Sequence, residues 1–215
     1  MFRLRTNLLA LLVILFAVTA ARADTIFFAN LTNSQEPPPL IPTLSDRVTP
    51  RPASFGTATF VLNDAQTQLT FTATIFNIDF TGIQTPDTFD NLTNAHIHAS
   101  SNPLFTPPTT AGVVWGFIGA PFNDNNPNDV VVTPFSTGVG GVVSGKWDLL
   151  EGNNTTLGAQ LANIFAGRSY INFHTVQFGG GEIRGQITAT PEPTTMLLLG
   201  TGLAGIAAKV RRRRR

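Results

Sequence analysis

The sequence predicts an all-β fold, either an antiparallel β-sandwich or a Greek-key barrel, with about nine strands and one short helix. Its composition is rich in Thr, Phe, Val, Asn and Gly and poor in Leu, Lys and Glu, as in β-proteins. From Gln66 to Ile75, apolar residues alternate with threonines, a pattern typical of a strand with one buried face. Turn-forming residues separate this segment from further short runs of the same kind.

Strands are expected in segments rich in β-branched and aromatic residues. In chain order these are Thr25–Leu31, Gly56–Leu62, Gln66–Ile75, Thr93–Ala99, Gly112–Ile118, Val130–Thr133, Val142–Leu149, Tyr170–Thr175 and Glu182–Ala189. A helix is expected at Leu157–Phe165, where the apolar residues fall on one helical face. Two proline-rich segments, Glu36–Pro52 and Pro103–Pro108, lack either period and predict extended loops.

The N-terminal segment has the three parts of a signal peptide, predicted to cover residues 1–23. Arg3 and Arg5 precede an apolar run from Leu8 to Val18, and an Ala-Arg-Ala cleavage site ends at Ala23. The mature chain would then begin at Asp24. An uncleaved anchor is the alternative, although the apolar run is short for a membrane span. Export agrees with a chain that has no cysteine and therefore no disulfide and no thiolate metal ligand.

The C-terminal segment, residues 191–215, combines a short motif, an apolar run and a basic end. Pro191-Glu192-Pro193 precedes Thr194–Val210, which is followed by the arginines Arg211–Arg215. A helix over 194–210 would be roughly 25 Å long, slightly less than a bilayer core of about 30 Å, so we expect a transmembrane helix there. The arginine tail, residues 211–215, would then stay on the cytoplasmic side.

This order of parts resembles the PEP-CTERM sorting signal of Gram-negative bacteria. The resemblance implies that Pro191, Glu192 and Pro193 form a sorting motif and that an exosortase processes the protein. It also implies a transient inner-membrane stage before release to the cell envelope or the extracellular space. A permanent single-span anchor without processing is the alternative.

Charge is unevenly distributed along the chain, whose overall net charge is +1. All 13 acidic residues lie between Asp24 and Pro193 together with only five basic ones, so this stretch carries a net charge of −8. An acidic body argues against nucleic acid as a partner, because nucleic acid binds to basic surfaces. The terminal arginines are therefore interpreted as a topology signal.

The body, residues 24–190, resembles the CHRD domain, a family first described in chordin. The opening Phe28–Leu31, the central Ala95–His98, the strand Tyr170–Thr175 and the closing Gly181–Ile187 follow the order of the family's motifs. The resemblance implies an immunoglobulin-like β-sandwich. It implies no established catalytic reaction, and we expect that the protein is not an enzyme.

The chain has three histidines, and all three lie in these motifs. His96 and His98 are two positions apart on a strand, so both side chains point to one face. If the strand that carries His174 lies nearby, the three imidazoles converge on a site that suits zinc or copper, with a carboxylate such as Glu182 as a further ligand. The alternative is that the histidines hydrogen-bond backbone or carboxylate groups and stabilise the sheet.

Two further polar features have structural interpretations. Glu182 and Arg184 are expected to form a cross-strand ion pair. The acidic, asparagine-rich segment Asp124–Asp129 could supply oxygen ligands for Ca²⁺, but it lacks the spacing of an EF-hand loop and is interpreted as a solvated turn.

Two classes of function follow from these observations. The first is a non-enzymatic exported protein with a structural or adhesive role, whose partners are signal peptidase, an exosortase and exopolysaccharide or other matrix components. The second is a periplasmic or extracellular metal-binding protein that uses His96, His98 and His174 to hold zinc or copper. No other cofactor is expected.

Overall fold

The computed structural model describes residues 23–190 and 193–213. Its body is an antiparallel β-structure with one short α-helix and a single 3-10 turn, η2 (Asn33–Gln35). The strands are β1 (Thr25–Thr32), β2 (Phe55–Leu62), β3 (Gln68–Phe76), β4 (Leu92–Ala99), β5 (Gly112–Ile118), β6 (Val131–Pro134), β7 (Gly140–Asp148), β8 (Ser169–Thr175), β9 (Ile183–Gln186) and β10 (Thr188–Ala189).

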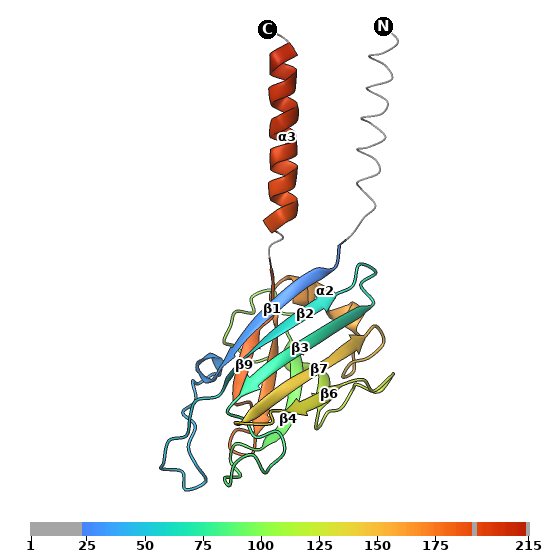
Figure 1. Ribbon diagram of the computed structural model, residues 1–215. Helices are drawn as coiled ribbons and strands as arrows, with labels where there is room; N and C mark the ends of the chain where they lie inside the picture. The colour runs from blue at the N-terminus through green and yellow to red at the C-terminus, as the bar shows by residue number, and fades with distance from the viewer. Residues whose placement is uncertain (1–22, 191–192, 214–215) are drawn as a thin grey trace.

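The strands form one curled sheet, ordered β5-β4-β8-β9-β1-β2-β3-β7-β6, with β10 paired to β1 off this path (Figure 1). The long strands β1, β2, β3 and β7 pair in unbroken register, as in Phe28↔Thr59 and Thr59↔Thr72. A narrow junction joins this half to the other, because β1 and β9 share only the pair Thr32↔Arg184. The sheet is therefore a set of two β-layers that are continuous with each other.

Aromatic side chains fill the space that the curled sheet encloses. Trp115 of β5 stacks on Trp147 of β7 at 5.7 Å, and Phe71 of β3 contacts Phe117 of β5 at 4.8 Å. These contacts join strands that lie far apart in the sheet order, which places the two layers face to face. Burial of such side chains supplies the main driving force for folding.

The alternation expected in the third predicted strand is confirmed. In β3 the apolar side chains Leu69, Phe71, Ala73 and Ile75 are buried, whereas the threonines between them lie on the outer face. The last predicted strand, Glu182–Ala189, is in fact two strands. Its first half, β9, pairs with β8, and its second half, β10, leaves β8 and pairs with β1. The chain therefore changes its neighbouring strand between β9 and β10, and this change divides the predicted strand into two.

The helix α2 (Leu157–Phe165) has the bounds that the apolar pattern predicts. Thr156 caps its N-terminus, since the side-chain oxygen accepts a hydrogen bond from the backbone N–H of Ala159. Leu157 and Ile164 are buried in the core, while Phe165 at the end of the helix is partly exposed and contacts Phe27. The helix thus closes one end of the curled sheet.

A second helix, α3 (Pro193–Arg213), follows the body (Figure 1). No helix in the described ranges is both long enough and apolar enough to cross a membrane. The structure therefore does not support the transmembrane helix predicted at 194–210. A helix does form over these residues.

Candidate metal centre

Strands β4 and β8 are unusual in this sheet because both of their faces are covered. Every residue of β8 is buried, as are the last five residues of β4. The two strands pair in antiparallel register, with Asn94 opposite His174 and His98 opposite Tyr170. Loops that precede β5 and follow β5 and β8 lie over the outer face, so side chains that alternation directs outward are enclosed as well.

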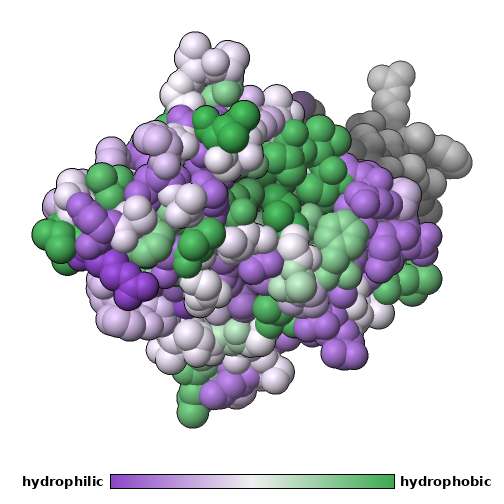
Figure 2. All heavy atoms as spheres, turned by 90° about the horizontal axis from the view of Figure 1, so that it is seen from below, coloured by the Kyte–Doolittle hydropathy of each residue, from purple (hydrophilic) through white to green (hydrophobic). Residues whose placement is uncertain are grey.

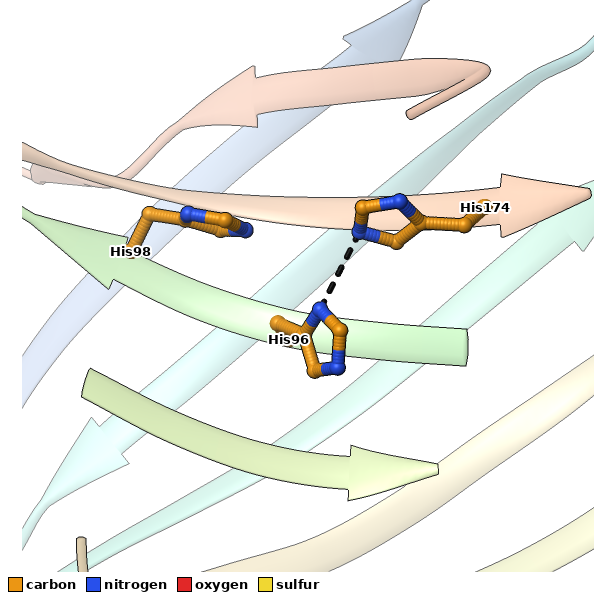
Figure 3. Close-up of side chains that lie close together, drawn as sticks. All are labelled: His96, His98 and His174. Atoms are coloured by element: carbon orange, nitrogen blue, oxygen red, sulfur yellow. Dashed lines mark hydrogen bonds between the residues drawn. The ribbon is translucent and has the colours of Figure 1, made fainter. Parts of the chain in front are cut away.

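Three of these enclosed side chains are the histidines, which we call the histidine cluster (His96, His98 and His174). They come together as the sequence predicts, with one ring nitrogen from each within 4.8 Å of the others. Figure 3 shows the rings turned toward a common space, with Nδ1 of His96 3.1 Å from Nε2 of His174. Their exposed fractions are 4%, 8% and 5%, so the cluster is nearly dry.

A backbone carbonyl holds the other nitrogen of each ring. His98 Nδ1 lies 2.9 Å from the carbonyl oxygen of Ala111, and His174 Nδ1 lies 3.0 Å from that of Gly179. His96 Nε2 lies 3.1 Å from the carbonyl oxygen of Ala120. A carbonyl only accepts, so each of these nitrogens carries the proton in a neutral ring. The remaining nitrogen of each ring then carries a lone pair, and these three lone pairs face the centre of the cluster.

The hydrogen bonds of His96 and His174 need more protons than two neutral rings possess. The contacts to Ala120, to Gly179 and between the rings each require one N–H, which makes three, whereas two neutral imidazoles carry two. The contact between the rings therefore joins two lone pairs unless a cation lies between them. Nε2 of His98 is also buried without a hydrogen-bond partner among the described residues.

An extra proton is a poor candidate for the cation between these two rings, because burial disfavours a charged imidazole. Burial, with a smaller contribution from the neighbouring His174, lowers the pKa of His96 to about 4. Burial likewise lowers the pKa of His98 to about 4 and lowers the pKa of His174. The rings are therefore neutral at pH 7, the form in which imidazole binds metal ions.

Carbonyls that fix the outer nitrogen of each ring are typical of metal-binding histidines, because they set the tautomer and the direction of the free lone pair. The turn that supplies Ala120 depends on Gly119, whose φ of +69° favours glycine. A Cβ at Gly119 would also clash with Asn94, whose side chain accepts a hydrogen bond from the Ala120 N–H. The local backbone is thus shaped to present this carbonyl to His96.

Tyr170 lies against one side of the cluster. Its ring stacks on that of His98 at 4.7 Å with an angle of 5° between the planes. The guanidinium of Arg184 lies over the other face of the tyrosine, 4.3 Å from its centre, and pairs with Glu36 at 2.7 Å. This row of side chains fixes the orientation of His98 and brings one positive charge near the cluster.

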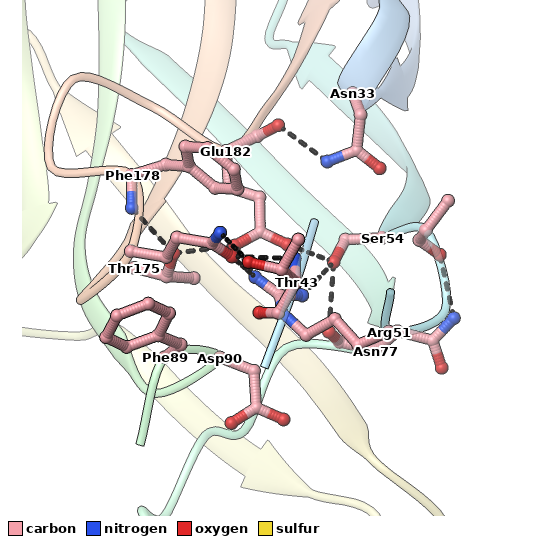
Figure 4. A network of polar contacts seen from close by, with 12 residues as sticks. Asn33, Thr43, Arg51, Ser54, Asn77, Phe89, Asp90, Thr175, Phe178 and Glu182 are labelled. Atoms are coloured by element: carbon pink, nitrogen blue, oxygen red, sulfur yellow. Dashed lines mark hydrogen bonds and ion pairs between the residues drawn. The ribbon is translucent and has the colours of Figure 1, made fainter. Parts of the chain in front are cut away.

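Glu182 does not join the histidines. It is fully buried in a separate group, which we call the Glu182 network (Glu182, Arg51, Ser54 and Thr175; Figure 4). Arg51 donates two hydrogen bonds to its two carboxylate oxygens, at 2.8 and 2.7 Å. Ser54 and Thr175 donate one more to each oxygen. With all its lone pairs engaged, Glu182 is not available as a metal ligand, and that expectation is wrong.

The predicted pair between Glu182 and Arg184 is also wrong, since each has a partner from the proline-rich loop. Glu182 pairs with Arg51, and Arg184 pairs with Glu36. Neither loop residue could be placed from the sequence, because the loop has no periodicity. The charges at the ends of the loop could have suggested them, because Glu36 lies at its start and Arg51 lies near its end.

The segment Asp124–Asp129 is not a solvated turn at its start. Asp124 is fully buried, and its carboxylate accepts hydrogen bonds from the backbone N–H groups of Asp129 and Val130. It therefore folds the segment back on itself. Among the described residues, the histidine cluster is the only group of three or more His, Cys, Asp or Glu side chains that could hold a metal ion together.

The residues predicted for export and sorting lie at the ends of the described residues or outside them. Ala23 and Asp24, which flank the predicted cleavage site, are exposed, while the preceding 22 residues lie outside the described residues. Pro191 and Glu192 also lie outside them, and Pro193 begins α3. Cleavage and sorting at these positions stay predictions.

Comparison with known families gives two matches. The family described as CHRD domain matches residues 27–187, which covers most of the chain. The PEP-CTERM protein-sorting motif matches residues 189–214. No curated protein and no solved structure matches the chain.

Proposed function

Since the chain belongs to the CHRD domain family, we propose that it is an exported, non-catalytic β-domain with a structural or adhesive role outside the cytoplasm. The PEP-CTERM motif at 189–214 implies processing by an exosortase and export to the cell envelope or the extracellular space. Signal peptidase and a transient inner-membrane stage belong to the same proposal, which for these steps rests on the order of motifs along the chain.

The shape of the body supports an adhesive role. The pairing of β1 with β10 places both ends of the body at one end of the sheet, and loops occupy the opposite end. Several apolar loop side chains are largely exposed there: Ile41 79%, Val48 79% and Ile83 86%. Seen from that end, apolar groups lie among polar ones, and several of them are adjacent in one area of the surface (Figure 2). Such groups are available to a matrix component.

The adhesive role is tested by retention on isolated extracellular matrix. The double variant Val48→Ser, Ile83→Ser should bind less than the wild type, because it removes apolar surface at the loop end. Leu150→Ser is the matched control, since Leu150 is 74% exposed but follows β7 at the other end. Equal retention of all three proteins would count against adhesion through the loops.

The sorting step is tested by replacing Pro191, Glu192 and Pro193 with alanine and measuring the mass of the protein recovered from envelope and medium. We expect the variant to keep its C-terminal segment and to stay associated with cells. Thr194→Ala, Thr195→Ala is the control, because it changes the adjacent residues and keeps the motif. Normal processing of the triple variant would disprove the proposal.

A second candidate function is metal binding by the histidine cluster, and a specific observation favours it. Three inward lone pairs within 4.8 Å lack the protons that would otherwise satisfy them. Zinc and copper both accept neutral imidazole. Metal analysis and melting curves of the purified protein test this function. Absence of bound metal, with a melting temperature that neither ion changes, would exclude it.

A further inference from the structure

We propose that the ion held by His96, His98 and His174 is monovalent copper, Cu(I), bound by three neutral imidazole nitrogens. This inference rests on the second candidate function above, and it specifies the charge and the coordination number of the ion. It follows from three properties of the cluster: the charge of its ligands, the nearest fixed charge and the number of donors.

The first property is the absence of an anionic ligand. Among the described residues, the group of possible ligands consists of the three histidines alone. Two buried carboxylates elsewhere in the body each pair with an arginine, Glu182 with Arg51 and Glu36 with Arg184. The ion's charge is therefore not compensated inside the site. Because the cost of burying a charge rises with its square, a divalent ion costs about four times as much as a monovalent one.

The second property is the positive charge of Arg184. Its guanidinium lies over the Tyr170 ring, on the face opposite to the one that stacks on His98. Its field therefore disfavours any cation in the cluster, and it disfavours a divalent ion twice as strongly. Glu36, which pairs with Arg184 at 2.7 Å, reduces this field.

The third property is the number of donors. Zn²⁺ in protein sites prefers four ligands in a tetrahedron. Here no fourth His, Cys, Asp or Glu side chain joins the cluster among the described residues, and the rings are almost fully buried from water that could serve as a ligand. The hydroxyl of Tyr170, whose ring stacks on His98, is hydrogen-bonded to the backbone of Ala111. Three nitrogens about 2.0 Å from one ion in a plane lie about 3.5 Å apart. The shortest pair in the cluster is at 3.1 Å and the widest within 4.8 Å. A small inward shift of His98 completes this trigonal geometry, which suits the d¹⁰ Cu(I) ion.

The experiment titrates the purified full-length protein with Cu(I) under anaerobic conditions against the chromogenic chelator bicinchoninate, and with Zn²⁺ against a zinc dye. We expect one Cu(I) per chain and at least 100-fold weaker binding of Zn²⁺. At a free concentration about 100 times the dissociation constant, Cu(I) should raise the melting temperature by about 5–10 °C. X-ray absorption at the copper edge should report three nitrogen ligands at about 2.0 Å.

A matched pair of variants locates the site. His98→Phe keeps the stack on Tyr170 and removes one lone pair, so Cu(I) affinity should fall at least 100-fold. Tyr170→Phe keeps the stack and all three nitrogens, so Cu(I) affinity should stay within a few-fold of the wild type. His174→Gln, with a melting curve to check folding, provides a second ligand deletion if His98→Phe does not fold.

The outcomes separate this inference from the function on which it rests. Tighter binding of Zn²⁺ than of Cu(I) would overturn the monovalent assignment and leave metal binding intact. Binding of neither ion would remove both. Retention of Cu(I) affinity in both His98→Phe and His174→Gln would show that the ion lies elsewhere.

Discussion

Two buried polar clusters lie side by side in this protein and differ in how completely their hydrogen bonds are satisfied. His174 belongs to the histidine cluster and its neighbour Thr175 to the Glu182 network, because successive side chains of β8 point to opposite faces. In the Glu182 network each carboxylate oxygen receives two hydrogen bonds. In the histidine cluster, lone pairs face each other.

This difference indicates different roles. Buried polar groups stabilise a fold when every partner is present, and they cost stability when one is missing. A saturated network is complete without any ligand, so the Glu182 network is structural and anchors the proline-rich loop through Arg51. A cluster whose lone pairs face each other is a place where the fold gives up stability, and such places are enriched in binding sites.

The largest expected effect is the loss of a charge from the saturated cluster. Arg51→Met leaves the fully buried Glu182 without its cation and should lower the free energy of unfolding by about 3–5 kcal/mol. Chemical denaturation measures this. Lys146→Met is the control, because Lys146 pairs with Asp129 and Asp148 near the surface and should contribute no more than about 1 kcal/mol. Similar losses in both variants would contradict the assignment of a structural role to the Glu182 network.

The next effect is the response of the metal-free protein to acid. The pKa of His96 and that of His98 fall from their usual 6.5 to about 4 on folding, mainly through burial. The folded state therefore takes up these protons less readily than the unfolded chain. Stability from this source is complete above pH 6.5 and is lost as the pH falls toward 4. Melting curves between pH 7.5 and 4 should show a decline of several degrees that bound metal delays. A flat profile would mean that the rings are not buried in neutral form.

A smaller effect is expected when the saturated cluster loses one hydroxyl. Thr175→Val keeps the shape of the side chain and removes the hydrogen bond of 2.6 Å to Glu182. The free energy of unfolding should fall by about 1–3 kcal/mol, because a buried carboxylate oxygen loses a donor. An unchanged denaturation midpoint would indicate that this contact is dispensable.

The smallest effect is expected from the unsaturated cluster. His98→Phe removes a buried nitrogen that has no partner among the described residues and keeps the stack on Tyr170. In the metal-free protein we expect a change within about 1 kcal/mol, in the stabilising direction, since the lost bond to Ala111 is offset by the removal of the unpartnered nitrogen. A loss as large as that of Thr175→Val would remove the contrast between the clusters.

The sequence predicted the parts of this molecule that periodicity controls. Alternation places the strands and explains why His96 and His98 share a face, and the helical period gives α2 its bounds. The convergence of His174 follows once β4 and β8 pair. That pairing itself could not be predicted, because His96 and His174 lie 78 residues apart and no local pattern links their strands.

The remaining features depend on irregular backbone. The carbonyls of Ala111, Ala120 and Gly179 belong to loops, and the identity of these residues carries no information about where a carbonyl points. The partner of Glu182 lies 131 residues away in a loop without periodicity. The double burial of β8 has the same origin, because loops and not strands cover its outer face. Sequence patterns thus located the histidines but not the groups that orient them.

The pairing of β10 with β1 has a mechanical consequence. In a protein tethered through its C-terminal segment, any pull on the body enters through β10. A few hydrogen bonds hold that end, among them Thr190 N–H to the carbonyl of Ile26 at 2.9 Å. Beyond β10, the fully buried Ile187 and Ile183 would have to leave the core next. Tension should therefore release the last strand first, while the loop anchored by Arg51 and Glu182 stays folded at the far end.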